Sequence, residues 1–464
     1  MAGLVGCGGE ETSQDPPDPP VETGWRPGQA LPGERQGPRG QLDLRGLIHA
    51  HSVNSHDACD GEPWDEATGA TNEPCFDDFR RDVCRVGHDF VMLSDHGERF
   101  SRTEFPDTLL YRADRGDRLV ERAGGPVASF AACRADDQLE GGPAEVLILA
   151  GNESAMMPVG LPGHIAATEA ERDAVYGDAS ADNVSALQAH GAVVLAQHTE
   201  DWTTADIVDL GFDGFEMYNL HANTIQGAGG VLELIGLQNQ APEELPAPDL
   251  FLLNILNEDA RYLERWGDVL ATGRQAVTTI GTDCHQNTFP QLLEDGERID
   301  SYRRMMAWMS NHLLVRADPD GSYDDRHLVE ALREGRLYGV FEVLGFPTGF
   351  DFHAEAGGAT HEMGARLSLS SDLHLRVTAP EVRDLDPGAE APKIVSVLYR
   401  AVAGGFEEVT RVEGDLDEAV AEPGAYRVEI RMEPRHLREH LGALADLADR
   451  EIVWIYGNAI VVDP

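Results

Sequence analysis

The sequence is poor in basic residues, with 36 lysines and arginines against 82 aspartates and glutamates, a formal net charge of −46. A surface this acidic repels phosphate backbones and anionic headgroups, so we expect neither nucleic acid nor a membrane surface as a partner. No apolar run is long enough to cross a bilayer. The chain also lacks a G-x-S-x-G elbow and a P-loop, which leaves no sequence signal for a serine nucleophile or an NTPase.

The 464 residues are 42% hydrophobic. That amount supports a large buried core and predicts two or three domains. The acidic excess is spread along the whole chain and indicates an adaptation for solubility or salt. We place the domain boundaries at 1–40, a disordered tether; 41–342, an α/β unit; and 343–464, a β domain.

The N-terminal segment is acidic and rich in proline, and it cannot bury enough surface to fold alone. Within it, Leu4-Val5-Gly6-Cys7 is similar to a bacterial lipobox, although no basic and apolar region precedes it. This pattern predicts a lipid anchor at Cys7 and a location in the bacterial cell envelope or periplasm. A chance match is the alternative reading.

An exported chain can keep disulfides. Beyond Cys7 and Cys284, four cysteines form an even set, and no CxxC zinc spacing occurs among them: Cys59, Cys75, Cys84 and Cys133. Three connectivities are possible, and sequence alone does not separate them. Free buried thiols are the alternative, and a buried thiol is the role we expect for Cys284.

Short β-rich apolar runs recur from Leu44 onward, each ending in a polar cluster and most preceding a helical segment. The runs are Leu47–Ile48, Asp89–Leu93, Val146–Ala150, His164–Thr168, Ala192–Ala196, Gly214–Met217 and Ala276–Ile280. Alternating strands and helices predict a parallel sheet with buried strands. Seven such units favour a closed or distorted (β/α) barrel, an α/β fold. Helices are expected at Leu250–Gly273 and His327–Gly335.

The pattern changes near Val343, where apolar and polar residues begin to alternate. Such alternation occurs at Leu367–Thr378, Ile394–Val402, Ala425–Met432 and Val453–Val462. Turn-forming residues separate these stretches, so we expect a small antiparallel domain that resembles a β-sandwich.

Side chains that bind metals follow the predicted strands, where α/β barrels place their active sites. They are His49, His51, Asp57, Asp95, His96, Glu153, His164, His198, Asp283 and His285. Such a set suits zinc, manganese or iron. His49 and His51 are two apart, so on a strand both would point to one face, and Asp283 and His285 repeat this spacing. Asp95 and His96 are adjacent, so we expect His96 to be the ligand and Asp95 to orient it or form a turn.

In this order, the motifs HAHSVNSHD, LSDHGE, GNES, GHIA, AQH and GTDCH resemble those of the PHP (polymerase and histidinol phosphatase) superfamily of metal-dependent hydrolases. The resemblance covers about residues 44–340. The tail containing WIYGNAIVV resembles the β domain of the CehA/McbA-like branch. The resemblance implies a distorted seven-stranded barrel that binds two or three divalent metal ions.

The resemblance also implies ligand sets. His49, His51, Glu153 and Asp283 would hold one ion. Glu153 would bridge to a second, held with His164 and His198, while Asp57, His96 and His285 would hold a third. The first motif departs from the commoner family pattern, so His56 and Asp60 are alternatives to Asp57. Each residue alone has an ordinary structural reading, such as a helix cap or a core histidine. Those readings would need independent coincidences at successive strand ends.

The function expected from this set is hydrolysis by a metal-bound hydroxide. We assign catalytic roles to Asp283, Glu153 and His96, with Asp283 as a possible proton shuttle. A small-molecule phosphate ester is the first substrate class, and a carboxyl ester or carbamate is the second. A non-catalytic metal-binding surface protein is a further alternative. Side chains that could contact substrate are Arg99, Arg102, Asn219 and His221, and Glu216 and Tyr218 could also line the pocket.

Overall fold

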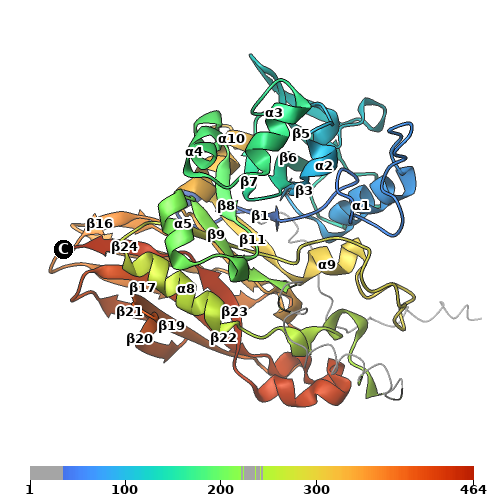
Figure 1. The fold of residues 1–464 in the computed structure, drawn as a ribbon. Helices are drawn as coiled ribbons and strands as arrows, with labels where there is room; N and C mark the ends of the chain where they lie inside the picture. Colours follow the sequence, from blue (N-terminus) through green and yellow to red (C-terminus); the bar gives the residue numbers. More distant parts are fainter. Residues whose placement is uncertain (1–34, 221–222, 224–235, 237–240, 242–243) are drawn as a thin grey trace, which may run out of the picture.

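The computed structural model describes residues 35–220, 223, 236, 241 and 244–464. The fold is mixed α/β, with a large mixed sheet and a separate four-stranded antiparallel sheet. Figure 1 places the N-terminal half of the chain above and the C-terminal strands below and to one side. Lipobox residue Cys7 and substrate candidate His221 lie outside the described residues.

Seven strands between residues 42 and 281 pair side by side in chain order: β1 (Leu42–Ile48), β2 (Phe90–Met92), β6 (Glu145–Glu153), β7 (Met157–Leu161), β8 (Val193–Ala196), β9 (Gly214–Asn219) and β10 (Val277–Gly281). A backbone bridge between Ala50 and Cys284 links the segments that follow β1 and β10. The outer edge of β1 pairs with β11 (Ser310–Val315), and β11 pairs with β12 (Leu337–Val340).

The expectation of a wholly parallel sheet is wrong, because β7 is antiparallel to both of its neighbours. Only Ser154–Met156 separate β6 from β7, and a parallel crossover needs a dozen or more residues. The predicted strand His164–Thr168 is also wrong. Thr168 is instead the N-cap of α3 (Glu169–Tyr176), in a capping box with Glu171.

The helices surround this sheet in Figure 1. They are α1 (Glu73–Val86), α2 (Gly97–Phe100), α3, α4 (Ala181–His190), α5 (Thr204–Leu210), α8 (Ala260–Ala271), α9 (Tyr302–Trp308) and α10 (Asp325–Arg333). Helix α10 agrees with its prediction. The helix expected from Leu250 begins only at Ala260, because the Asp259 side chain accepts a hydrogen bond from the Arg261 amide and caps it there. Among the described residues, none of the helices combines the length and hydropathy needed to span a membrane.

The C-terminal strands form two sets. Strands β14 (Asp351–Ala356), β15 (Ala359–Glu362), β17 (His374–Thr378) and β21 (Leu416–Ala419) make the separate antiparallel sheet. Strands β16 (Arg366–Ser368), β19 (Lys393–Val402), β20 (Gly405–Glu413), β22 (Gly424–Glu433), β23 (Ile452–Gly457) and β24 (Ile460–Asp463) belong to the large sheet, as do β3 (Asp95–His96), β4 (Arg118–Arg122) and β5 (Gly125–Ala132). Short strands β13 (Pro347–Thr348) and β18 (Glu381–Val382) pair with each other.

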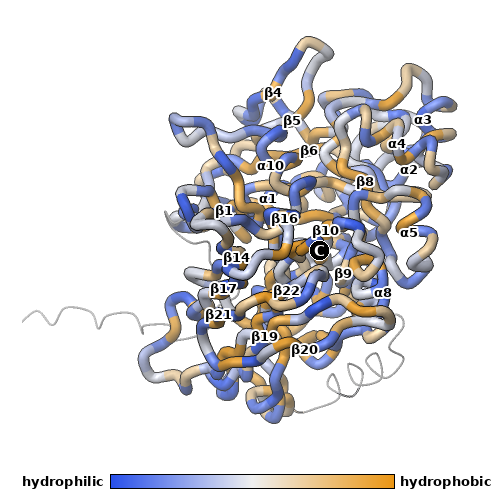
Figure 2. The backbone as a smooth tube through the Cα atoms, turned by 90° about the vertical axis from the view of Figure 1, so that its left-hand side faces the viewer, coloured by the Kyte–Doolittle hydropathy of each residue, from blue (hydrophilic) through white to orange (hydrophobic). Residues whose placement is uncertain are grey.

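The two regions of the chain share backbone pairing, because β12 is hydrogen-bonded to β23. Apolar side chains of the four-stranded sheet and of the C-terminal strands of the large sheet belong to one buried cluster, which also includes side chains of β8 and β9. The sandwich-like packing stays a prediction. Figure 2 shows hydrophobic segments in the interior around β10 and hydrophilic segments in the peripheral loops. The boundary between 342 and 343 stays a prediction.

The cysteines pair as Cys59–Cys75 and Cys84–Cys133, and Cys284 is a free, buried thiol. One of the three open connectivities is thereby selected. Both disulfides end on α1, the first at its N-terminal turn and the second near its C-terminal turn.

Candidate metal centre

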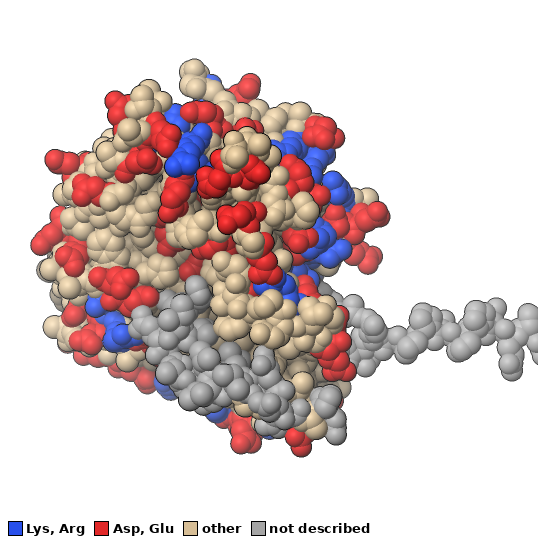
Figure 3. All heavy atoms as spheres, turned by 45° about the vertical axis from the view of Figure 1, so that its right-hand side comes forward, with Lys and Arg blue, Asp and Glu red and all other residues tan. Residues whose placement is uncertain are grey.

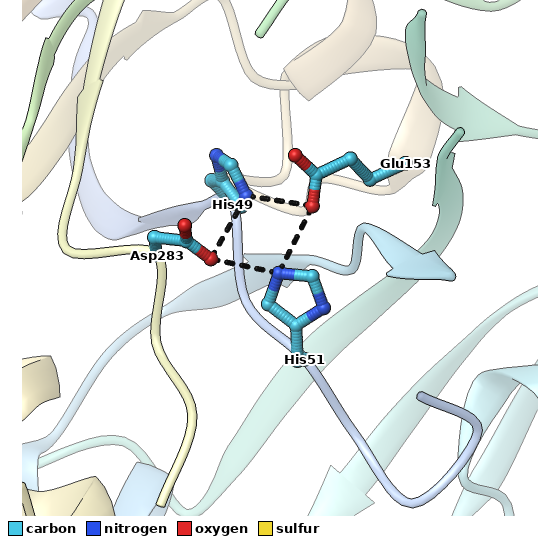
Figure 4. Close-up of side chains that lie close together, drawn as sticks. All are labelled: His49, His51, Glu153 and Asp283. Carbon is cyan, nitrogen blue, oxygen red and sulfur yellow. Dashed lines mark hydrogen bonds and ion pairs between the residues drawn. The ribbon is translucent and has the colours of Figure 1, made fainter. Parts of the chain in front are cut away.

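Four buried side chains converge at the carboxyl ends of three strands (Figure 4): His49 and His51 after β1, Glu153 at the last residue of β6, and Asp283 after β10. Glu153 Oε2 lies 3.1 Å from His49 Nε2 and 3.2 Å from His51 Nε2. Asp283 Oδ1 lies 3.2 Å and 2.9 Å from the same two nitrogens. The four ligand atoms lie within 4.8 Å of one another, a geometry that could hold a metal ion.

A second group shares His51 and adds Asp57 and His96. The Nε2 of His96 lies 3.1 Å from Asp57 Oδ2 and 4.0 Å from Glu153 Oε2. The His285 ring centroid lies 5.9 Å from that of His51. The three residues predicted to hold a third ion therefore gather beside the first group.

His198 approaches Glu153 from the other side. Its Nε2 lies 3.0 Å from Glu153 Oε1 and 3.6 Å from Asp283 Oδ2. The two oxygens of Glu153 thus face different histidines, an arrangement compatible with the bridging role that the sequence predicts.

The backbone is strained at this centre. His49, His198 and Asp283 have φ values of 82°, 44° and 55°, and they are three of the six described non-glycine residues with positive φ. Such conformations cost free energy and cluster at functional sites. The reason given for His49 and His51 sharing a face is therefore wrong: β1 ends at Ile48, and a left-handed residue, rather than strand alternation, brings the two rings together.

Three of the candidate ligand histidines are oriented through their second ring nitrogen. His49 Nδ1 lies 2.8 Å from Glu216 Oε1, and Asn219 donates a 3.0 Å hydrogen bond to the other Glu216 oxygen. His51 Nδ1 lies 2.9 Å from Ser55 Oγ, and His96 Nδ1 lies 3.0 Å from the Glu153 carbonyl. A proton on Nδ1 leaves Nε2 as the metal ligand, as is usual at metal sites.

The sequence did not identify Glu216 as a partner of His49, although it marked Glu216 and Asn219 as pocket candidates. A signal was available, because a lone carboxylate inside the buried strand GFEMYN needs a partner. Asp95 accepts hydrogen bonds from the Ser52 amide and hydroxyl at 2.6 and 2.8 Å, so it braces the loop after His51. Burial raises the pKa of Asp95 to about 6 despite these bonds.

Charges at the centre are balanced by histidines. Burial lowers the pKa of His49 and His51, but the surrounding carboxylates outweigh it and raise both well above their usual value. Burial also lowers the pKa of His198, which Glu153 and Glu200 raise to about 11. For Glu153, burial raises the pKa and the histidines lower it further, so the net direction is downward. Buried carboxylates need compensating positive charge, and divalent cations would supply it. The donor set therefore fits a metal centre.

His164 lies outside both groups. Its Nε2 lies 2.8 Å from the Thr103 carbonyl, to which it must donate, and its Nδ1 lies 3.4 Å from the Tyr176 hydroxyl. Phe100 and Phe105 pack edge-on against the ring. The ligand role predicted for His164 is not supported by this position.

The alternatives to Asp57 point elsewhere. Asp60 pairs with Arg298 at 2.5 Å. His56 is exposed and stacks on the His96 ring at 4.6 Å. Only Asp57 of the three belongs to a candidate ligand group in the described part of the chain.

The predicted substrate arginines have protein partners. Arg99 donates to the Gly69 carbonyl at 2.8 Å and lies over the Trp64 ring, while Arg102 pairs with Glu169. A further acidic group, Asp249, Asp295 and Glu297, is neutralised by Arg303 and Arg304, which lie within 2.8 Å of its carboxylates. We therefore do not propose this neutralised acidic group as a second metal centre.

No known family, curated protein or solved structure was found to match this chain.

Proposed function

We propose that the protein is a metal-dependent hydrolase of the PHP type acting on a small-molecule ester. One observation carries this proposal: His49, His51, Glu153 and Asp283 are each at most 3% exposed, yet their ligand atoms converge on one point. A structural core has little reason to bury two carboxylates beside two histidines in strained backbone. The order of the motifs and the ring of paired strands support the seven-stranded barrel as part of the proposal.

The proposed centre holds two or three divalent ions, with zinc, manganese or iron as candidates. Divalent ions at such a site lower the pKa of bound water, so that hydroxide is available near neutral pH. The chain's own contribution is to fix the ligands. Glu216 and Ser55 hold the rings of His49 and His51, and Glu153 presents one oxygen to each side of the centre.

Glu153 and His96 are proposed to act in catalysis, and Asp283 is the proposed proton carrier. Its Oδ1 faces His49 and His51, and its Oδ2 lies toward His198. A carboxylate placed between ligands can accept a proton from the attacking group and pass it to the leaving group. The partly exposed side chains of His198, His96 and Asp57 give the centre its contact with solvent.

Phosphate esters are the first substrate class in this proposal. A carboxyl ester or carbamate is the second, and one observation favours it: in the described part of the chain, the cationic groups that pair with Glu153 and Asp57 are all histidines. A doubly charged phosphate monoester needs more positive charge than a diester or a neutral carbonyl, so we rank monoesters below diesters.

The location and the partners of the protein are proposed from the sequence alone. The N-terminal pattern favours a lipid-anchored protein of the bacterial envelope or periplasm, with membrane contact only through Cys7. The partners would be small molecules rather than nucleic acid. A metal-binding surface protein without activity is the alternative from another class.

The test is hydrolysis of matched p-nitrophenyl phosphate, phosphodiester, acetate and carbamate by protein loaded with Mn²⁺ or Zn²⁺. Asp283→Ala should abolish turnover, whereas Asp446→Ala, at an exposed aspartate, should leave it unchanged. Turnover of one ester class that only Asp283→Ala abolishes would support the proposal and select the substrate class. Bound metal without turnover of any of the four esters would favour the metal-binding alternative.

A further inference from the structure

The ligand Asp57 lies on a segment without regular structure. Between His51 and the start of α1 at Glu73, the described chain forms turns and isolated bridges. Most residues of 60–62 and 65–70 are exposed. His49, Glu153, His198 and Asp283, in contrast, lie at or within two residues of a strand end. Asp57 therefore depends on local anchors more than the other ligands do.

One anchor is noncovalent. The Ala58 carbonyl accepts a hydrogen bond from the Gln286 amide at 2.8 Å and another from the Tyr302 hydroxyl. The other anchor is covalent, because Cys59, two residues after Asp57, is bonded to Cys75 in the first turn of α1. Cys59 and Cys75 are 6% and 4% exposed, so the bond sits inside the fold.

Residues 59 and 75 are separated by 16 positions. A cross-link over this length removes much of the conformational freedom of the segment between them. Asp57 lies outside this segment, two residues before Cys59, so the disulfide acts on it by fixing the end of the turn that carries it. Without the bond, ion binding by Asp57 would also have to order this turn, and that cost would appear as weaker affinity. The group of His49, Glu153 and Asp283 would not bear this cost.

We propose that the Cys59–Cys75 disulfide is the positioning element for the ion that Asp57 and His96 would hold, and that breaking the disulfide selectively weakens binding of this ion. The inference rests on the proposed metal centre. Reduction by a dithiol such as dithiothreitol transfers two electrons and two protons, converts the disulfide into two thiols and leaves the reagent as its cyclic disulfide. The metal centre takes no part in that exchange.

The second disulfide offers a matched control. Cys84–Cys133 also ends on α1, but nine residues further along the helix, which is about 13 Å at 1.5 Å per residue. Cys133 lies between β5 and β6, and its backbone amide donates to the Ala144 carbonyl rather than to a candidate ligand. Its removal should lower stability without touching the ion at Asp57.

The experiment measures Mn²⁺ stoichiometry and stepwise affinity by equilibrium titration for the wild type, Cys59→Ser/Cys75→Ser, Cys84→Ser/Cys133→Ser and Asp57→Asn. We expect Cys59→Ser/Cys75→Ser to keep its tightest site and to bind the ion at Asp57 about 10- to 100-fold more weakly. Adding Asp57→Asn to Cys59→Ser/Cys75→Ser should weaken binding of that ion no further than Asp57→Asn does alone. The control pair should bind as the wild type does.

Equal Mn²⁺ binding by the wild type and Cys59→Ser/Cys75→Ser would overturn this inference and leave the proposed function intact. Failure of the wild type to bind any divalent ion would overturn both. If the serine pair does not fold, the same titration on Cys84→Ser/Cys133→Ser protein before and after reduction, with the reductant removed and folding followed by circular dichroism, decides the question, because Cys59–Cys75 is the disulfide that remains to be reduced. Loss of the ion at Asp57 in folded, reduced protein supports the proposal, and its retention overturns it.

Discussion

The orientation of a ligand histidine is fixed by whatever its other nitrogen touches. Here the strongest such contact is between His49 Nδ1 and Glu216 Oε1, at 2.8 Å and fully buried. Asn219 holds the second Glu216 oxygen, so the carboxylate has one position. This series of side-chain contacts from Asn219 through Glu216 to His49 therefore directs His49 Nε2 toward Glu153 and Asp283.

Glu216→Gln tests this chain of contacts. The amide keeps the volume of the carboxylate but removes its charge, so His49 is held less firmly and its nitrogen becomes less basic. Loss of such a partner costs about 10- to 100-fold in metal affinity. Competition titration with a chelator measures the affinity, and Glu418→Gln, at a partly exposed position on β21, is the control. An unchanged affinity in Glu216→Gln would show that the charge of Glu216 does not tune His49 as a ligand.

Most candidate ligands could be predicted at the residue level because their types and order carry the signal. Their geometry could not. Local sequence does not reveal that His49 and Asp283 adopt left-handed backbone. The case of His164 shows the limit: after Gly163, a histidine that faces a metal and one that faces the Thr103 carbonyl look alike in sequence.

At the scale of elements, the join between β10 and β11 depends on one side chain. The Asn311 amide accepts a hydrogen bond from the Ile280 N–H at 3.0 Å and donates one to the Ile280 carbonyl at 2.7 Å. The side chain thus makes hydrogen bonds in place of backbone pairing between two strands that are not paired with each other. Asn458 does the same between Thr278 and β12.

Asn311→Ala should destabilise the protein through the strands rather than through the centre. It leaves the buried N–H and carbonyl of Ile280 without their partner, at about 1–3 kcal/mol for each group. We expect a loss of about 2–5 kcal/mol in the free energy of unfolding, measured by urea denaturation. Asn183→Ala, at a partly exposed helix position, should cost far less. Equal losses in the two variants would contradict the role of Asn311.

A buried ionic network joins β1 and β11 to Glu342, which lies two residues after the end of β12. Arg45 makes a two-pronged ion pair with Glu342, and His312 lies 2.9 Å from Asp43 and 3.6 Å from Glu342. Burial lowers the pKa of His312, but Asp43 and Glu342 outweigh it and raise the pKa to about 9.

The pKa of His312 predicts a pH-dependent stability. Its folded pKa lies above the unfolded value of about 6.5, so its contribution is fully present below pH 6.5 and is lost as the pH rises through 9. In urea denaturation, His312→Asn should therefore differ most from the wild type near pH 6 and least above about pH 9.5. A difference that stays constant with pH would show that His312 is neutral in the folded protein.

The secondary structure was predictable where periodicity decides it, as for β19, β22 and α10. The reversal of β7 was not, because direction depends on the length of a connection whose ends the sequence leaves uncertain. Pairing of β12 with β23 is a contact between residues over 100 positions apart. No local pattern encodes such a pairing, and for that reason the C-terminal strands were expected to form a sheet of their own.

On the scale of the whole molecule, electrostatic repulsion acts against folding. The charge of −46 is distributed over the surface, and Figure 3 shows acidic side chains across the face with basic ones set among them. The chain contains a single lysine, Lys393, so nearly all of its positive charge is carried by arginine. Many arginines already pair with carboxylates, and the remaining carboxylates repel one another.

Salt should therefore stabilise this protein. The screening length falls from about 10 Å at 0.1 M to about 3 Å at 1 M ionic strength, which weakens repulsion between exposed carboxylates more than it weakens buried pairs such as Arg45–Glu342. We expect the Tm to rise with NaCl, with most of the gain below about 0.5 M, where screening changes fastest. Sucrose, which also favours compact states but does not screen charge, separates repulsion from general exclusion effects. A Tm that stays level or falls with NaCl while rising with sucrose would mean that the arginine–carboxylate pairs, rather than the excess acid, dominate the electrostatics of folding.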